Sequence, residues 1–103
     1  MIMHLVLFRL RSNLSAEAVE ELFADLDGLR QRIPGITSFS GGLECSPEGR
    51  GRGFTHAFAM TFRDATARDN YLPHPAHDAV AQRLLSMLDG PEETSLLVFD
   101  YES

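Results

Sequence analysis

Four stretches of the chain have hydrophobic patterns that predict β-strands. Residues 2–10 are almost continuously apolar, which favours a strand that is covered on both faces. Residues 54–62 alternate larger and smaller side chains with the period of two that a strand requires. Residues 36–44 give a weaker signal because they contain two glycines, and residues 94–101 close the chain with an apolar run.

Helical spacing of apolar residues separates the predicted strands. Residues 16–32 follow Ser15, which is a good N-cap, and end before Pro34 and Gly35. Their apolar stripe consists of Val19, Leu22, Phe23, Leu26 and Leu29, continued by Ile33. Two more helices are predicted at residues 64–71, with Asp64 as N-cap, and at residues 78–88.

A stiff elbow of residues 71–77, Tyr-Leu-Pro-His-Pro-Ala-His, lies between the last two helices. Each proline biases the residue before it, Leu72 or His74, towards extended backbone. Pro75 suits the first turn of a helix, and a helix begun there carries His77 in that turn. The elbow therefore fixes the direction of titratable side chains, which is typical of a site as well as of a structural corner.

The order of the elements, βαββαβ with one additional short helix, is typical of the ferredoxin-like plan. We therefore expect an α+β fold in which a four-stranded antiparallel sheet carries its helices on one face, and a single domain spanning residues 1–103. The strands are apolar on both faces, so the helix-free face needs a cover. A homodimer in which two sheets face each other is the simplest solution.

Charge and composition exclude several classes of partner. With 9 Lys and Arg against 15 Asp and Glu, the net charge of −6 disfavours nucleic acid and anionic membranes. The single cysteine cannot form an internal disulfide, and the apolar N-terminal run is too short to span a bilayer. We expect a cytoplasmic protein with neither a nucleic-acid partner nor a membrane partner.

Histidines occupy the large-apolar faces of two predicted strands. His4 shares its face with Val6 and Phe8, and His56 shares its face with Phe58. If the two strands are adjacent in an antiparallel sheet, His4 and His56 could be neighbours. Together with the elbow they would form a polar cluster inside an apolar cavity, as in a small-molecule site. A single histidine on such a face is more often a core residue with a satisfied hydrogen bond.

A metal or cofactor site is not expected. The spacing His74-x-x-His77 is shorter than the H-x₃₋₅-H of zinc sites, and there is no cysteine pair. Nothing singles out an axial ligand for haem, and residues 49–53 precede a strand, not the helix that a phosphate-binding loop would require.

Five motifs spread along the whole chain resemble those of the Dabb family, the stress-responsive dimeric α/β-barrel domains. They are His4-x-Val6-x-Phe8, Ile33-Pro34-Gly35-Ile36, Thr55-His56-Ala57-Phe58, Tyr71-Leu72-Pro73-His74-Pro75-Ala76-His77 and Val98-Phe99-Asp100-Tyr101. The resemblance implies a ferredoxin-like subunit that pairs with a second copy to form a dimeric α/β barrel around an apolar interior.

The resemblance also implies a function, because one plant member of the family closes a linear polyketide by an aldol condensation. Tyr71 and His77 match its catalytic pair, and His4, His56 and His74 match its pocket histidines. His77 would be the general base and Tyr71 would stabilise the developing oxyanion. Leu26 replaces an aromatic residue of that enzyme, so the same substrate is not expected.

We therefore expect a small, largely apolar carbonyl-bearing or aromatic ligand and, if the chain is an enzyme, a cofactor-free cyclase or lyase. Residues expected to contact the ligand, besides Tyr71 and His77, are His4, Val6, Phe8, Phe23, His56, Phe58 and His74. The alternative is a non-catalytic, stress-associated or structural dimer whose interior is filled by Phe8, Phe23, Phe58 and Met60. In that case Tyr71 and His77 only lock the elbow, and His74 is a structural hydrogen-bond donor. A monooxygenase-like barrel is a third, weaker alternative.

Overall fold

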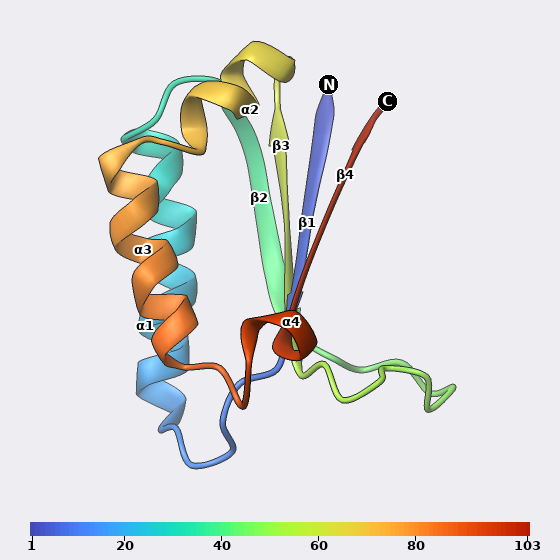
Figure 1. Cartoon of the computed structure of the whole chain (residues 1–103). Helices are drawn as coiled ribbons and strands as arrows, with labels where there is room; N and C mark the ends of the chain where they lie inside the picture. Colours follow the sequence, from blue (N-terminus) through green and yellow to red (C-terminus); the bar gives the residue numbers. More distant parts are fainter.

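The computed structural model describes residues 1–103 and shows one four-stranded sheet with its two long helices on one side (Figure 1). Every strand pairs antiparallel with its neighbours, in the order β2-β3-β1-β4. The strands are β1 (Ile2–Phe8), β2 (Ile36–Leu43), β3 (His56–Phe62) and β4 (Leu96–Glu102). This arrangement confirms the predicted α+β, ferredoxin-like subunit.

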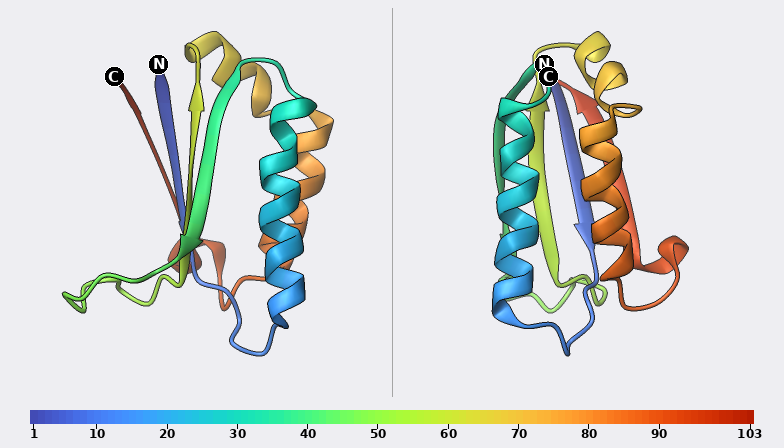
Figure 2. Two further views of the ribbon diagram at one scale, coloured as in Figure 1. Left: turned by 180° about the vertical axis from the view of Figure 1, so that it is seen from behind. Right: turned by 90° about the vertical axis from the view of Figure 1, so that its left-hand side faces the viewer.

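Two long helices lie side by side over the same face of the sheet (Figure 2). They are α1 (Ala16–Gly28), which continues into the 3₁₀ helix η1 (Leu29–Gln31), and α3 (Pro75–Ser86). Two shorter helices, α2 (Ala65–Tyr71) and α4 (Glu92–Ser95), precede α3 and β4 respectively. None of these helices has the length and apolar character needed to cross a membrane.

The central strand β1 supplies the core through strict alternation. Its inward residues His4, Val6 and Phe8 are buried, whereas the outward ones between them are only half-buried. On the paired strand β3, the inward residues Met60 and Phe62 are completely buried. The two-residue period read from the sequence is therefore confirmed on this strand.

Local side chains cap the helices where the sequence predicts it. The Ser15 hydroxyl accepts a hydrogen bond from the Ala18 amide at 3.1 Å, and the Asp64 carboxylate accepts one from the Ala67 amide at 2.8 Å. Both caps satisfy amides in a first helical turn that have no partner within their own helix.

Two local expectations are wrong. Leu72 is not extended but helical (φ −57°, ψ −44°), because its amide donates to the Arg68 carbonyl and continues α2 for one more residue. The last strand does not begin at residue 94, because residues 92–95 form the short helix α4. The extended conformation of His74 (φ −65°, ψ 134°) and the start of α3 at Pro75 are as expected.

The outward face of the sheet is apolar and carries no helix (Figure 1). The alternation places Met3, Leu5 and Leu7 of β1 on this face. On the neighbouring edge strand β4, Leu97, Phe99 and Tyr101 are 44%, 58% and 46% exposed. An exposed apolar patch of this kind marks a contact surface.

The two glycines in β2 have different roles. A Cβ atom on Gly41 would lie 2.7 Å from the Phe23 ring, 2.9 Å from the Ala57 carbonyl oxygen and 3.0 Å from the Phe58 Cβ. A Cβ atom on Gly42 would meet nothing within 4 Å. Gly41 is therefore required for close packing of the Phe23 ring against the sheet, whereas Gly42 is not.

We predict that Gly41→Ala lowers the free energy of unfolding by about 1–3 kcal/mol through overpacking. Gly42→Ala, the matched control on the next residue of the strand, should change it by less than about 0.5 kcal/mol. Urea unfolding followed by circular dichroism measures both values. Equal effects of the two substitutions would contradict this account of Gly41.

Candidate functional site

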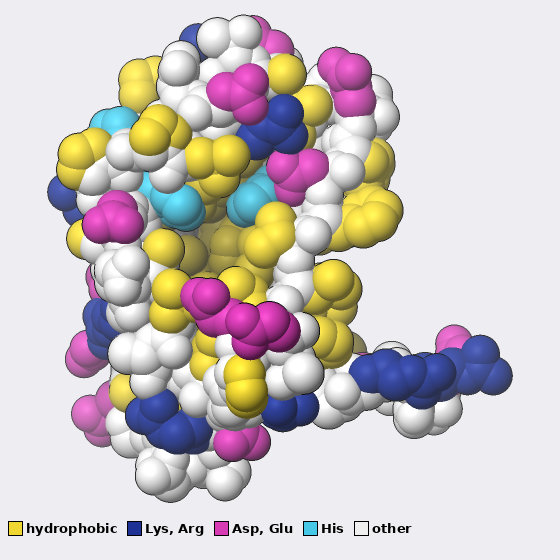
Figure 3. Space-filling model, viewed as in Figure 1, with side chains coloured by type: hydrophobic (Ala, Val, Ile, Leu, Met, Phe, Trp, Pro, Cys, Tyr) yellow, Lys and Arg dark blue, Asp and Glu magenta, His cyan; other side chains and the backbone are white.

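A hollow of about 240 Å³ lies between the sheet and α3. It is bounded by β1, β3 and β4 on one side and by α3 on the other, and α4 closes one end. The lining residues are mostly apolar: His4, Val6, Leu26, Phe58, Tyr71, Leu72, His77, Ala81, Leu84, Leu85, Glu92, Leu96 and Val98. Figure 3 shows this hollow with an apolar floor, histidines on one edge and acidic side chains on the opposite edge.

Tyr71 and His77 stand together at the edge formed by the elbow. Their ring centroids are 4.2 Å apart. The Nδ1 atom of His77 lies 2.8 Å from the Leu72 carbonyl oxygen, which can only accept, so Nδ1 carries the proton. In the neutral ring the Nε2 atom is therefore the unprotonated nitrogen, as a general base requires.

His4 is held by a chain of charged groups that joins three elements. Its Nδ1 atom lies 2.7 Å from one carboxylate oxygen of Asp100 on β4. The other oxygen of Asp100 accepts a hydrogen bond at 2.9 Å from Arg68 on α2. Asp100 thereby fixes the ring of His4 and its tautomer, leaving Nε2 as the free nitrogen.

Three polar atoms of the lining have no partner within the protein: the Tyr71 hydroxyl, His4 Nε2 and His77 Nε2. No fully buried side-chain nitrogen or oxygen lacks a hydrogen bond, so these atoms retain accessible surface. All three residues line the same hollow, and the His4 and Tyr71 ring centroids are 5.8 Å apart. The hollow thus combines apolar walls with convergent unpartnered polar groups, as small-molecule sites do.

Burial determines the protonation states of Tyr71 and His77. It raises the pKa of the Tyr71 phenol above its ordinary value, and the negative charge of Asp100 adds to the effect. Burial lowers the pKa of His77, although the hydrogen bond to Leu72 opposes the shift. At neutral pH the site therefore holds a protonated phenol, which donates, beside a neutral imidazole, which accepts.

His56 does not join His4, contrary to our expectation. The strand register places His4 opposite Met60 and His56 opposite Phe8. The His56 ring stacks on Phe8 with a centroid distance of 6.1 Å, and its Nδ1 atom lies 2.8 Å from the Thr55 hydroxyl. His56 therefore lies at the far end of the strand pair and does not line the hollow.

His74 also lies outside the hollow and has a structural role. Its Nδ1 atom accepts a hydrogen bond at 3.0 Å from the Ala76 amide, so the imidazole caps the N-terminus of α3. This contact agrees with the expected structural role of His74. The ring accepts the hydrogen bond, however, whereas we expected it to be the donor. Such a side-chain cap replaces the Ser, Thr, Asp or Asn that usually stands at this position.

The interior is filled at one end and hollow at the other. Phe8, Phe23, Phe39 and Phe58 form a chain of aromatic contacts with centroid distances of 5.6–6.2 Å. Of the residues expected to contact a ligand, Phe8 and Phe23 belong to this filled end, whereas Val6 and Phe58 line the hollow. One expectation was an open interior and the alternative was a filled one. The aromatic side chains fill one end of the interior and leave the other end open.

Three residues in or next to the hollow were not predicted from the sequence to belong to the site: Asp100, Arg68 and Glu92. The period of two along β4 could have indicated that Asp100 shares a face with Val98. Its pairing with His4 spans 96 residues and follows only from the register of β1 and β4. No group of three or more His, Cys, Asp or Glu side chains is arranged to hold a metal ion.

Fold and site together define a ferredoxin-like domain with an open Tyr–His hollow on one face of its sheet and a bare apolar surface on the other. The family model of the stress responsive A/B barrel domain, Dabb, matches residues 2–103. The chain belongs to this family.

Two curated relatives match over nearly the whole chain. The stress-response A/B barrel domain-containing protein HS1 of Arabidopsis thaliana is 33% identical, over 96% of this chain and 86% of that protein. Olivetolic acid cyclase of Cannabis sativa is 26% identical, over 95% of this chain and 92% of that protein. The chain is thus similar in sequence to a family member named as a cyclase.

Solved structures extend the similarity. A dimeric ferredoxin-like protein of unknown function from Jannaschia sp. CCS1 superposes with a TM-score of 0.87 at 29% identity, covering 99% of this chain and 98% of that one. Hydroxynitrile lyase from Passiflora edulis superposes with a TM-score of 0.85 at 25% identity, covering 97% and 90%. Structural neighbours of this chain thus include a dimer and a protein named as a lyase.

We predict that the folded protein loses stability as the pH falls below 6.5, the ordinary histidine pKa. Burial lowers the pKa of His77 and of His56, so the unfolded chain binds more protons than the folded one in this range, and protonation favours unfolding. Urea unfolding at pH 7.5, 6.5 and 5.5 measures the dependence. His77→Asn should have a shallower dependence than the wild type; an unchanged slope would contradict the assignment to His77.

Proposed function

We propose that the chain binds a small, largely apolar ligand that carries a carbonyl group or an aromatic ring, in the hollow between the sheet and α3. The volume of about 240 Å³ supports this proposal, because an apolar cavity of about 150 Å³ suffices for benzene. The polar groups of the lining would orient a carbonyl oxygen. The observation that carries the proposal is that three residues lining one apolar hollow, Tyr71, His4 and His77, each have a polar atom without a hydrogen-bond partner in the protein.

The chemistry that this arrangement supports best is that of a cofactor-free cyclase or lyase of the aldol type. His77 Nε2 would remove a proton from the carbon next to a carbonyl group. The Tyr71 hydroxyl would donate a hydrogen bond to the oxygen on which negative charge develops. A relative named as a cyclase and a structural neighbour named as a lyase support this class of reaction.

A second candidate is a non-catalytic dimer associated with stress. The aromatic contacts around Phe8 and Phe58 favour it, because they fill part of the interior. In this case the elbow serves only to fix the corner between α2 and α3. The two candidates differ in what removal of the Tyr71 hydroxyl does, because that hydroxyl forms no hydrogen bond that stabilises the fold.

We predict that Tyr71→Phe and His77→Gln each reduce turnover of a linear β-polyketone by about 100-fold or more. Tyr71→Phe should leave the unfolding temperature unchanged. Its affinity for an aryl ketone should stay within a few-fold of the wild-type affinity. Ala81→Phe, which fills the hollow from α3, should abolish both binding and turnover.

The measurements are product formation by chromatography and ligand binding by calorimetry. Equal turnover in the wild type, Tyr71→Phe and His77→Gln would remove this pair from the mechanism. Aryl ketone binding by the wild type without turnover of the polyketone would support a binding protein, and the absence of both binding and turnover would support the non-catalytic dimer.

We also propose that the bare sheet face pairs with a second copy of the chain, so that two sheets enclose a barrel. Leu97, Phe99 and Tyr101 are exposed on this face, next to the apolar outward side of β1. A dimeric structural neighbour at 29% identity supports this arrangement. A symmetric pair would bury the same patch on both subunits.

We predict that Phe99→Glu converts the dimer into a monomer, because it places two carboxylates in an apolar contact. Ala24→Glu, on the exposed side of α1, is the control and should leave the dimer intact. Sedimentation equilibrium distinguishes the two states. A wild-type chain that sediments as a monomer would contradict the proposed assembly.

A further inference from the structure

The only acidic side chain that lines the hollow is that of Glu92. The other lining groups are apolar, apart from Tyr71 and the two histidines. Figure 3 shows acidic side chains on the edge of the hollow that lies opposite the histidines. A ligand in the hollow therefore lies between the carboxylate of Glu92 at one edge and the side chains of Tyr71 and His77 at the other.

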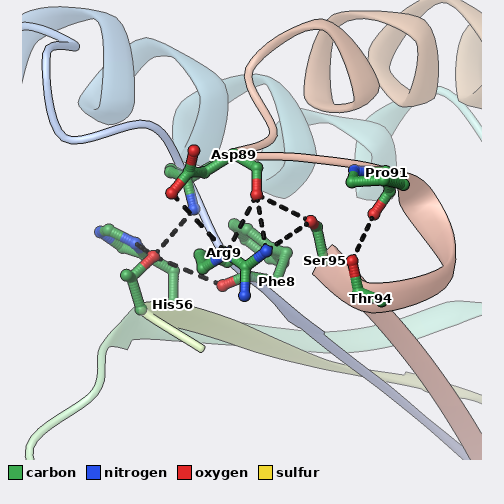
Figure 4. A network of polar contacts seen from close by, with 9 residues as sticks. Phe8, Arg9, His56, Asp89, Pro91, Thr94 and Ser95 are labelled. Atoms are coloured by element: carbon green, nitrogen blue, oxygen red, sulfur yellow. Dashed lines mark hydrogen bonds and ion pairs between the residues drawn. The ribbon is translucent and has the colours of Figure 1, made fainter. Parts of the chain in front are cut away.

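A network of hydrogen bonds holds the segment that carries Glu92 (Figure 4). The Arg9 guanidinium donates to the Asp89 carbonyl oxygen from Nε at 3.0 Å and from Nη2 at 2.8 Å. The Ser95 hydroxyl, completely buried, donates to the same oxygen at 2.9 Å. These contacts fix both ends of the turn that contains α4, so Glu92 occupies a defined place at the rim.

Every basic group in or near the hollow is already paired or neutral, so none is left to balance an anion there. His4 lies 2.7 Å from the carboxylate of Asp100. Arg68, which approaches it from α2, is paired with Asp69 at 2.8 Å and with Asp100 at 2.9 Å. Arg83 of α3 pairs with Glu21 and Asp25 of α1, on the other side of the helix. Burial lowers the pKa of His77, so its ring is neutral at neutral pH. An anionic ligand would be desolvated without a partner.

We propose that Glu92 determines specificity: the hollow accepts neutral or cationic aryl and carbonyl compounds and rejects carboxylates. The inference rests on the proposed function, since it names the charge class of the ligand for that same site. Glu92 contributes by electrostatic repulsion of anions at the rim and attraction of cations. It takes no part in the chemical step assigned to Tyr71 and His77.

Three aryl methyl ketones of equal shape test the proposal: 4-acetylbenzamide, 4-acetylbenzoate and 4-acetylbenzamidine, which are neutral, anionic and cationic at pH 7.5. Their dissociation constants are measured by calorimetry on the full chain, in low and in high salt. The matched variants are Glu92→Gln and Glu93→Gln. They remove neighbouring exposed carboxylates, of which only that of Glu92 lines the hollow.

We expect the wild type to bind the benzoate at least about tenfold more weakly than the benzamide, because the carboxylate loses its hydration without gaining a cation. Glu92→Gln should tighten benzoate binding about three- to tenfold and weaken amidine binding by a similar factor at low salt, with the benzamide unchanged. Glu93→Gln should leave all three constants within twofold of the wild-type values.

Two results would overturn the inference while leaving the proposed ligand class intact. One is equal affinity of the wild type for the benzoate and the benzamide. The other is an equal response to Glu92→Gln and Glu93→Gln, which would indicate a general surface field. Failure of all three ketones to bind would instead overturn the proposed function, and this inference with it.

Discussion

The structure depends on the alternation of one central strand, β1, which is hydrogen-bonded on both sides. Its inward side chains differ in character along its length. Phe8 packs into the filled aromatic end of the interior, Val6 borders the hollow, and His4 carries the polar group of the site. A slip of one residue would turn all three to the bare face. Core, cavity and site are therefore fixed by the same backbone register.

Much of the fold could be predicted because local chemistry decides it. Ser15 and Asp64 cap their helices, and Pro75 begins α3, through contacts within a few residues. Leu72 shows the limit of such rules, since one hydrogen bond to Arg68 extends α2 against the preference of a residue before proline. Local preferences are weak enough for a single favourable contact to override them.

The site could be predicted only in part. Tyr71 and His77 are close in sequence, so the elbow alone brings them together. His4 and His56 were expected to meet because both lie on apolar faces of paired strands, but a face does not specify a register. Asp100 and Glu92 belong to a strand and a turn whose positions depend on pairings across nearly the whole chain. Their contribution becomes visible only in three dimensions.

The two histidines of the elbow show how a proline-fixed backbone gives similar side chains different roles. His74, between Pro73 and Pro75, is extended and turns its ring back to the Ala76 amide. His77, one turn into α3, binds the Leu72 carbonyl and keeps its second nitrogen free. The proline-fixed backbone thus makes the His74 imidazole the cap of α3, whereas the His77 imidazole lines the hollow.

Alternate residues of the edge strand β4 face the hollow and the bare outer face of the sheet. Val98 and Asp100 border or support the hollow, whereas Phe99 between them points to the bare face. Because neighbouring residues of one strand share a rigid backbone, a partner that moves Phe99 also moves the support of His4. Under the proposed assembly and ligand site, thermodynamic reciprocity requires that any effect of the ligand on subunit affinity equals, in free energy, the effect of pairing on ligand affinity. In the proposed barrel, β4 thus belongs both to the contact between subunits and to the wall of the hollow.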